Sequence, residues 1–457
     1  MQTHSAALAA AAVASFLVPF MMSAVGITLP LIQADLSATA VELSWVAGSY
    51  ILVLAAILLP VGRLADIYGR RRTFVWGTVL FMAFSLCAAL AWSVFSLVLL
   101  RVLQGVGAAM ILTTAVAIVT ETCPRQERGR AMGILVACVY LGLSVGPLVG
   151  GLMTDLAGWR SVFYFCLPPG IAAWFLARRI DGEWRPAVGE GFDLPGSLFY
   201  VVSVLAAVSS LTHAAKPLVG GFLLMLAVVA GAFFVRRSRR VAHPILHLEL
   251  FTANRVFALS SLATLINYAG TFAVGFLLSL YLQVIKGFPP VEAGLILVIQ
   301  PVVQSLLSPL AGVLSDRVDP AALASLGMGL CAVGLGAMCG VDASTGLWVI
   351  GSILALQGVG FALFASPNMT VIMGSVAPRE YSIASSLVAT MRTFGMSLSM
   401  GVTTVVFGFL LHGRPVTAQT AAEFLASMDT IFAVCAVLCV VGVFCSLGRV
   451  RKKEARA

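Results

Sequence analysis

The chain has 457 residues, of which 60% are hydrophobic and only 10% are charged. A soluble domain carries about 25% charged residues, so this composition excludes a water-soluble globule, a disordered protein and a nucleic-acid-binding module. The formal net charge of +9 suggests an affinity for acidic partners until the positions of the cations are considered.

Apolar runs long enough to cross a bilayer, about 18 residues or more, occur along the whole chain. They contain Gly and Pro, as membrane helices tolerate, and they are longer than the strands of a membrane β-barrel, which have about ten residues. The first run has no basic region before it and no clean cleavage site, so it is interpreted as a retained span and not a signal peptide. The sequence predicts an all-α membrane protein with fourteen transmembrane helices, at about 7–32, 43–62, 73–91, 95–120, 131–154, 160–178, 194–213, 217–236, 256–284, 290–314, 320–341, 344–372, 382–411 and 428–448.

The nine cysteines do not indicate a disulfide framework, because eight of them lie within apolar runs. Cys435 and Cys439 share a helix face, but no His or acidic residue accompanies them, so they are expected to be packing residues. No metal and no cofactor is expected. An enzyme is also disfavoured, since no catalytic triad and no nucleotide-binding motif occurs in the sequence.

The cations are distributed unevenly between the two sides of the predicted bundle. Twenty-two of the 28 lie in the loops and tail of one side and four in the loops of the other, while Arg101 and Arg392 fall within spans. Cytoplasmic loops carry the excess of Lys and Arg. The sequence therefore predicts a plasma or inner membrane protein with both termini in the cytoplasm, and most of the net charge reflects this topology.

Short stretches of the first half recur in the second half at a nearly constant offset. The five residues Leu-Gln-Gly-Val-Gly at 103–107 reappear at 356–360, an offset of 253. Two further matches are Gly142-Leu143-Ser144 with Gly395-Met396-Ser397, and Gly62 and Asp66 with Gly312 and Asp316. The repeat aligns spans 2–5 with spans 10–13, so two parallel halves of six spans are predicted, with two inserted spans between them.

The predicted organisation is a six-helix half at 1–180, a two-helix insert at 181–255, a second six-helix half at 256–449 and a basic cytoplasmic tail at 450–457. Transporters built from repeated halves bind their substrate between the halves and alternate access by rocking. This organisation favours a transporter, and one chain with two halves is sufficient as a monomer.

The loop between spans 2 and 3 combines glycines, one acid and several arginines. Its glycines permit a tight turn, and Asp66 can pair with an arginine or cap a helix N-terminus, which is worth about 0.3–1 kcal/mol. The loop is interpreted as a conformational latch rather than a plain basic loop, because it is partly repeated in the second half. The predicted latch residues are Gly62, Arg63, Asp66, Gly69, Arg70, Arg71, Gly312, Asp316 and Arg317.

Two arginines lie within predicted spans. A buried Arg costs about 2.5–3.5 kcal/mol on insertion scales and should face a wet cavity or a partner. Arg101 lies about two turns into span 4 and is followed by Gln104, although it could instead extend to the outer headgroups. Arg392 lies near the middle of span 13 and is expected to face a cavity.

Span 5 carries a run of regularly spaced glycines. A four-residue glycine spacing forms a flat face for another helix, and Pro147 is expected to kink the span. The Pro-x-x-Gly-Gly sequence suggests a bend at the outer mouth. The residues of this motif are Gly142, Gly146, Pro147, Gly150 and Gly151.

Together these three stretches resemble the motifs of the major facilitator superfamily, and in particular its fourteen-span drug:proton antiporter branch. Residues 62–72 look like the family's motif A, 101–107 like motif B with its arginine associated with proton coupling, and 142–151 like motif C of exporters. The resemblance covers the whole chain, including the insert and the Phe-Asp-Leu-Pro-Gly segment at 192–196. It implies export of small drug-like compounds in exchange for protons.

Span 1 departs from that branch. Proton-coupled members often carry an acid about two turns before a proline that matches Pro30, but the stretch 21–30 contains none. A proton carrier should be a partly buried carboxylate or a His, and no acid lies deep in a predicted span. The coupling candidates are therefore Arg101, Gln104, Glu42 and Glu292.

A central cavity between the halves would be mainly apolar. Two arginines and no acid would favour neutral or anionic amphiphiles over cations, and Met and aromatic side chains suit hydrophobic compounds. The cavity candidates are Met22, Tyr50, Tyr140, Asn267, Tyr268, Gln300, Gln304, Gln357, Asn368 and Arg392.

The predicted partners are a small-molecule substrate, protons and the lipid bilayer, with no nucleic acid. Two alternatives to a proton-coupled exporter remain. One is a proton-independent facilitator or importer of a metabolite or a lipid-like anion, suggested by the missing span 1 acid. The other is a membrane sensor or scaffold that transports nothing.

Overall fold

The computed structural model describes residues 3–124, 127–213, 217–246, 249–315, 317–376 and 381–448. Within these ranges the chain is helical and contains no strand. Thirteen helical stretches in the same ranges are long and apolar enough to cross a membrane. The predicted all-α membrane architecture is confirmed.

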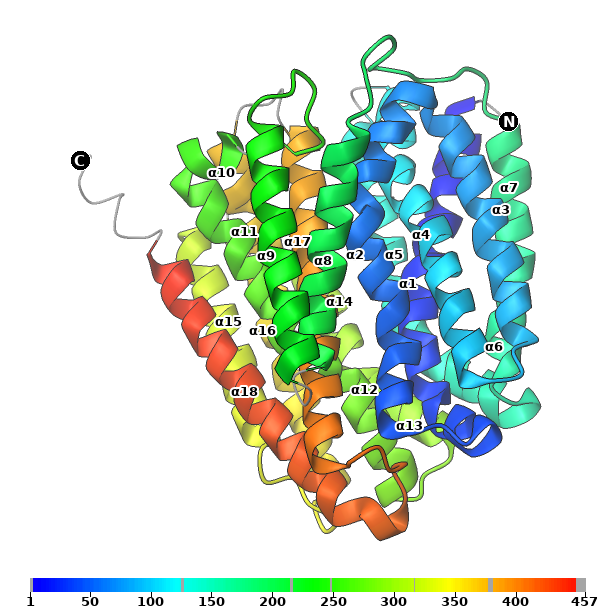
Figure 1. Ribbon diagram of the computed structural model, residues 1–457, viewed down its shortest axis with the longest axis vertical. Coiled ribbons are helices and arrows are strands. Elements are labelled where there is room, and N and C mark those ends of the chain that lie inside the picture. Colours follow the sequence, from blue (N-terminus) through cyan, green and yellow to red (C-terminus); the bar gives the residue numbers. More distant parts are fainter. Residues whose placement is uncertain are drawn as a thin grey trace.

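The first six predicted spans form one group of helices (Figure 1). The sixth span, predicted at 160–178, consists of two short helices that meet at Cys166. Pro168 and Pro169 follow this point and have no amide hydrogen to continue the helix. The helices are α1 (Thr3–Leu36), α2 (Ala40–Tyr68), α3 (Arg70–Ala89), α4 (Val94–Thr122), α5 (Arg128–Ala157), α6 (Arg160–Phe165) and α7 (Leu167–Arg178).

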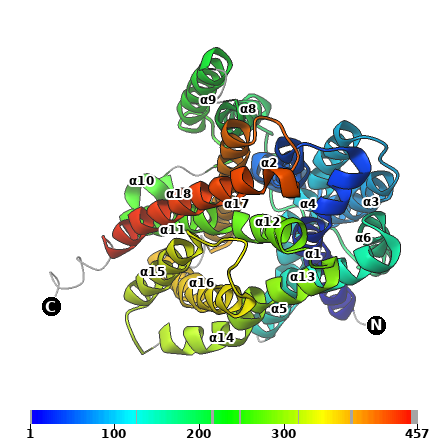
Figure 2. The same cartoon turned by 90° about the horizontal axis from the view of Figure 1, so that it is seen from below.

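The inserted spans are α8 (Leu194–Thr212) and α9 (Pro217–Ser238), followed by the short α10 (Glu249–Ala253). Figure 2 shows α8 and α9 at one edge of the bundle, with α8 beside α2 and α17. The Tyr200 hydroxyl of α8 donates a hydrogen bond to the Ala55 carbonyl of α2 at 3.0 Å. The insert therefore lies on the seam between the two larger groups.

The last six predicted spans form the second group. The runs predicted at 256–284 and 290–314 are each interrupted in the structure. The elements are α11 (Arg255–Thr271), α12 (Ala273–Leu280), the π-helix η1 (Tyr281–Ile285), α13 (Pro290–Leu297), α14 (Ile299–Ser315), α15 (Pro320–Met338), α16 (Leu347–Ser375), α17 (Tyr381–Leu410), the 3-10 turn η3 (Ala418–Thr420) and α18 (Ala421–Leu447).

The repeated glycines make equivalent contacts in the two groups. A Cβ on Gly107 of α4 would lie 2.8 Å from the Gly77 carbonyl of α3, and a Cβ on Gly360 of α16 would lie 2.9 Å from the Gly327 carbonyl of α15. Both pairs therefore pack backbone against backbone, which only glycine permits.

We call the end of the bundle where α1 begins and α18 ends the inner end, and the opposite end the outer end. Hydrogen bonds join the two groups in the outer part of the bundle. Ser44 of α2 and Thr404 of α17 lie 2.7 Å apart, Oγ to Oγ1. The Ser279 hydroxyl of α12 donates to the Gly26 carbonyl of α1 at 2.7 Å. The outer ends of the two groups are thus in contact.

Candidate functional site

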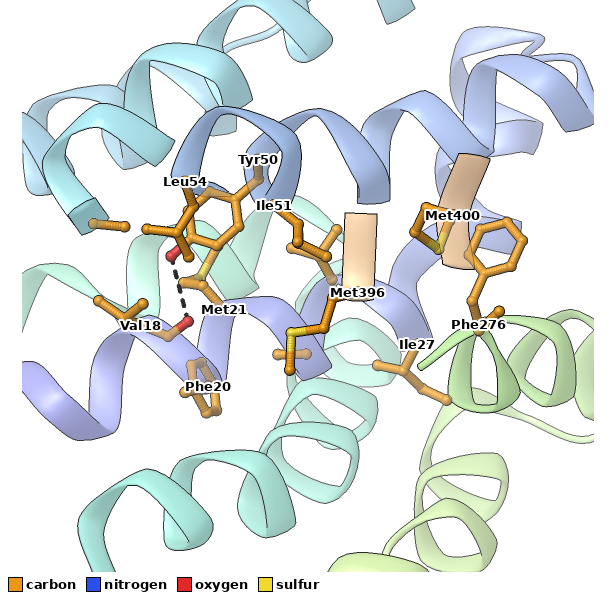
Figure 3. Packing of buried hydrophobic residues seen from close by; sticks show 14 of the residues in the cluster. Val18, Phe20, Met21, Ile27, Tyr50, Ile51, Leu54, Phe276, Met396 and Met400 are labelled. Carbon is orange, nitrogen blue, oxygen red and sulfur yellow. Dashed lines mark hydrogen bonds between the residues drawn. The ribbon is translucent and has the colours of Figure 1, made fainter. Parts of the chain in front are cut away.

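A cavity lies between the two groups of helices. Its wall from α1, α2 and α4 is apolar apart from Ser23, whose hydroxyl bonds to the Pro19 carbonyl of its own helix at 3.1 Å. Figure 3 shows Met396 and Met400 of α17 beside Ile51 of α2 and Phe276 of α12. This part of the cavity offers apolar surface to a ligand.

The polar part of the wall comes from α5, α11, α14 and α17. The Tyr140 hydroxyl interacts with Gln304 and lies within electrostatic reach of Arg392 and Tyr268. The ring of Tyr268 packs edge-on against Phe361 with centroids 5.7 Å apart. Six of the ten sequence-predicted cavity residues lie on the wall: Met22, Tyr140, Tyr268, Gln300, Gln304 and Arg392.

The structure corrects the expected position of the other four, Tyr50, Asn267, Gln357 and Asn368, which are buried between helices and do not line the cavity. The Asn368 amide donates to Thr264 Oγ1 at 2.9 Å, and the Gln357 amide donates to the Cys331 carbonyl at 3.3 Å. Asn267 is buried beside the same Cys331. The amides of Asn368 and Gln357 hold neighbouring helices together, as polar side chains do within membranes.

Arg101 is also buried, at 1% exposure, and does not reach the cavity. Its guanidinium stacks on the Tyr50 ring at 4.3 Å from the centroid. It donates to Gln104 Oε1 at 2.7 Å and to the Val46 carbonyl at 3.3 Å. Gln104 in turn donates to the Ser85 hydroxyl at 2.6 Å. The partners of Arg101 are therefore an aromatic ring and two uncharged oxygen acceptors. No acid pairs with it in the described ranges.

The two acidic coupling candidates form no ion pair with Arg101 among the described residues. Glu42 is exposed and closes a capping box with Thr39 at the start of α2. Glu292 is exposed in the first turn of α13. Within the described part of the chain, no Asp or Glu lines the cavity.

The loop between α2 and α3 connects the inner ends of several helices. Asp66 accepts a hydrogen bond from Arg70 Nε at 2.7 Å, and Arg70 also pairs with Glu121 of α4 at 3.1 Å. Arg63 pairs with Glu190 of the segment before α8. The hydrogen bond from Arg63 lowers the pKa of the Glu190 carboxyl. These ion pairs join α2, α3, α4 and the segment before the insert.

The remaining latch residues divide between the two groups. The Arg71 guanidinium donates to the carbonyls of Ala177 and Arg178 at 3.2 and 2.8 Å, so it caps the end of α7. A Cβ on Gly62 would lie 3.7 Å from Thr113 Cγ2, and one on Gly312 would lie 3.3 Å from Ser366 Oγ. Among the counterparts in the second group, Arg317 is exposed and Asp316 lies outside the described residues.

The glycine motif of α5 contacts both groups of helices. Gly142, Gly146 and Gly150 face α1 closely, with Gly150 leaving only 3.0 Å between a Cβ and Ala24 Cα. A Cβ on Gly151 would lie 2.5 Å from the Pro290 carbonyl of α13. The motif therefore packs against α1 of its own group through Gly142, Gly146 and Gly150. It packs against α13 of the opposite group through Gly151.

Sequence reasoning missed several apolar residues of the wall, among them Phe361, Met396 and Met400. A signal for two of them was available. Arg392, Met396 and Met400 recur every four residues along α17 and therefore share one helix face. Phe361 carries no such signal, because the apolar face of α16 towards the cavity cannot be distinguished from its faces towards lipid.

The fold and the cavity define a class of protein: a membrane protein built from two groups of helices with a cavity between them. The profile described as Major Facilitator Superfamily matches residues 11–260 and 260–457. The chain belongs to the major facilitator superfamily. The predicted resemblance to this family, including its drug-efflux-like branch, is confirmed by the relatives that follow.

Several curated proteins are similar over most of their length. The chain is 33% identical to the cephamycin export protein CmcT of Amycolatopsis lactamdurans, covering 92% of this chain and 88% of that one. It is 32% identical to the multidrug resistance protein Stp of Mycobacterium tuberculosis, covering 83% and 71%. It is 29% identical to the riboflavin transporter RibZ of Clostridioides difficile, covering 94% of each.

Solved structures share the fold. A bacterial homologue of the human lysosomal transporter Spinster, in an inward-facing and unoccupied conformation, superposes with a TM-score of 0.68 at 17% identity over 98% of this chain and 97% of that one. The POT family transporter PepTSo superposes with a TM-score of 0.67 at 14% identity over 98% of each chain. The protein is thus a multi-pass membrane transporter of this family.

Proposed function

We propose that this protein is a secondary active exporter of small amphipathic compounds that works by alternating access. The observation that carries the proposal is the cavity between the two groups of helices, with its mainly apolar wall and its contacts between the groups on the outer side. Relatives named as a multidrug resistance protein and an antibiotic export protein support export.

The proposed orientation places the inner end in the cytoplasm of a bacterial-type cell membrane, with both termini on that side. The loops at this end hold most of the cations, as the positive-inside rule requires. A single chain contains both groups and the entire cavity wall, so a monomer is sufficient. We assign the two six-helix groups to the halves at 1–180 and 256–449, with 181–255 as the insert and 450–457 as the tail.

The loop between α2 and α3 is the proposed conformational latch. Its ion pairs lie at the inner helix ends and not at the cavity, so they can bias one state without contacting a ligand. The glycine motif of α5 is proposed to act at the outer contact between the halves, through Gly151 and Pro147 against α13.

Proton antiport is the proposed energy source, and Arg101 with Gln104 is the buried polar cluster proposed to take part in it. Export relatives and the motif B resemblance support this step. A second candidate is a proton-independent facilitator or importer of a metabolite or lipid-like anion. It is favoured by the lack of a carboxylate on the described cavity wall and by the similarity to a riboflavin transporter.

Transport in liposomes separates these candidates. The purified chain is reconstituted with a fluorescent hydrophobic drug, and flux is followed with and without an imposed pH gradient, against protein-free liposomes. We expect flux that rises with the gradient and is accompanied by proton movement. Flux that ignores the gradient would favour the facilitator, and no flux for any compound of a broad panel would favour a sensor or scaffold.

A further inference from the structure

We propose that Arg392, Tyr140, Tyr268 and Gln304 form a head-group site for a monoanionic amphiphile, whose apolar body lies against the Met and Phe side chains on the outer side of the cavity. This inference rests on the proposed transport function and narrows its substrate class. It depends on the position of four polar residues, the absence of a competing acid and the polarity of the remaining wall.

The four polar residues lie at one depth in the bundle. Arg392 is eleven residues beyond the start of α17, Tyr140 twelve beyond the start of α5, and Tyr268 thirteen beyond the start of α11. Gln304 precedes the end of α14 by eleven residues. All four helix ends belong to the inner end, so at 1.5 Å per residue the four side chains form a layer about 16–20 Å from it.

Arg392 has no counter-charge in this layer. No ion pair involves it among the described residues, and no Asp or Glu of those residues lines the cavity. A cation in a cavity of low polarity is expensive unless a partner neutralises it. A bound ligand that carries one negative charge would supply that partner, whereas a cationic ligand would meet only repulsion.

The neighbours of Arg392 fit the recognition of an anion. A guanidinium offers paired N–H donors to the oxygens of a carboxylate or sulfonate. The Tyr140 and Tyr268 hydroxyls and the Gln304 amide are further donors. Gln304, Arg392 and Tyr268 are each within interaction range of Tyr140, and all four line the same cavity, so one acidic group of a ligand can reach several of them.

The rest of the wall fits an apolar body. Beyond the polar layer towards the outer end lie Met396, Met400, Phe276 and Ile51 (Figure 3). Among the residues that the structure describes, the opposite wall from α1, α2 and α4 has no charged member. A ligand with its acid at one end and a rigid apolar skeleton at the other therefore has one favoured orientation, with the acid towards the inner end.

A matched pair of probes tests this site. The probes 8-anilino-1-naphthalenesulfonate and N-phenyl-1-naphthylamine share one aromatic skeleton and differ in the sulfonate. Their affinities are measured for the full chain in nanodiscs, corrected with empty nanodiscs. We expect Arg392→Gln to weaken the sulfonate about tenfold or more, as for loss of a hydrogen bond to a charged group, and to leave the neutral probe unchanged. Arg392→Lys should retain part of the affinity.

Control variants separate charge from packing. Met22→Ala should weaken both probes, because it removes apolar contact from the shared skeleton, and Arg414→Gln, at an exposed outer position, should weaken neither. If Arg392→Gln does not fold, Tyr140→Phe and Gln304→Leu give the same comparison. The proposal is overturned if the wild-type chain does not bind the sulfonate, if Arg392→Gln leaves its affinity unchanged, or if both probes weaken equally.

The outcome also distinguishes this site from the proposed function. Selective loss of sulfonate binding without any flux in liposomes would support the site and reject the exporter. Flux of neutral compounds together with unchanged sulfonate binding in Arg392→Gln would reject the site alone.

Discussion

Gly69 joins α2 to α3 in a backbone conformation that other residues rarely adopt, with φ of +126°. The Glu183 side chain occupies the space beside it, since a Cβ on Gly69 would lie 2.5 Å from the carboxylate. That carboxylate accepts hydrogen bonds from the amides of Arg71 and Arg72 at 2.9 and 3.2 Å. Glu183 thus caps the start of α3, and glycine leaves room for it.

We predict that Gly69→Ala lowers the free energy of unfolding by about 1–3 kcal/mol, the usual cost of a strained backbone conformation. The added methyl group also displaces Glu183 from the α3 amides. The measurement is thermal unfolding of the purified chain in detergent. Gly191→Ala is the control, because a Cβ there meets nothing within 4 Å. Equal stability of Gly69→Ala and Gly191→Ala would contradict the prediction.

The position of a charged residue within a span could be predicted from the sequence. The position of an uncharged polar residue could not, because such a side chain can bond either to a neighbouring helix or to a ligand. Arg392 could be assigned to a cavity because a mid-span cation has few alternatives. Asn267 and Asn368 could not be separated from Tyr268 and Gln304, because a buried polar side chain bonds equally well to a neighbouring helix or to a ligand. The direction in which each side chain points decides between a helix contact and a ligand contact. That direction depends on how the helices pack, which a single sequence does not reveal.

The helices of the structure match the apolar runs of the sequence closely. Two interruptions of these runs occur where a backbone amide does not donate the usual hydrogen bond within its helix. The run at 290–314 divides into α13 and α14 because Pro301 has no amide hydrogen to donate to the Leu297 carbonyl. The run at 256–284 is interrupted before Ala273, whose amide donates to the Ser399 hydroxyl of α17 at 3.1 Å. The first interruption could be anticipated from the proline. The second depends on a contact between distant segments and could not.

The contact between α5 and α13 makes a prediction at the scale of these two helices. Gly294 of α13 packs directly on the Pro147 carbonyl of α5, so Gly294→Ala should push the outer ends of the two groups apart. We predict a larger outward-open population. The measurement is labelling of a Met400→Cys reporter by a membrane-impermeant maleimide added from outside to intact cells.

The reporter lies on the cavity wall, so its labelling should be faster in the Gly294→Ala background. Gly329→Ala of α15 is the matched control, because a Cβ there meets nothing within 4 Å, and the chain without the reporter corrects for the native cysteines. Unchanged labelling would show that the contact between α5 and α13 does not hold the outer side closed.

At the scale of the whole molecule, repetition made the architecture predictable. Three short matches at nearly one offset aligned the halves, and the glycines of those matches bring equivalent helices together in each half. The placement of the insert on the seam between α2 and α17 was not predictable, since α8 and α9 have no counterpart in the repeat. Hydropathy identifies both as spans but contains no information about their neighbours.

The outer contact between the halves leads to the last prediction. Ser44 of α2 and Thr404 of α17 approach each other side chain to side chain, at 2.7 Å between oxygens, which is compatible with the Cβ separation of a disulfide, about 3.5–4.5 Å. We predict that the Ser44→Cys, Thr404→Cys double variant loses transport in liposomes on oxidation and recovers it with a reductant, because alternating access requires these helix ends to separate. Probe binding to the cavity should persist in the oxidised protein, since the cross-link holds the two helices in the arrangement that forms the cavity.

Each single-cysteine variant controls for oxidation of the native thiols. Undiminished transport by a fully cross-linked protein would mean that α2 and α17 move together, and the separation of the halves would then have to occur elsewhere along the seam.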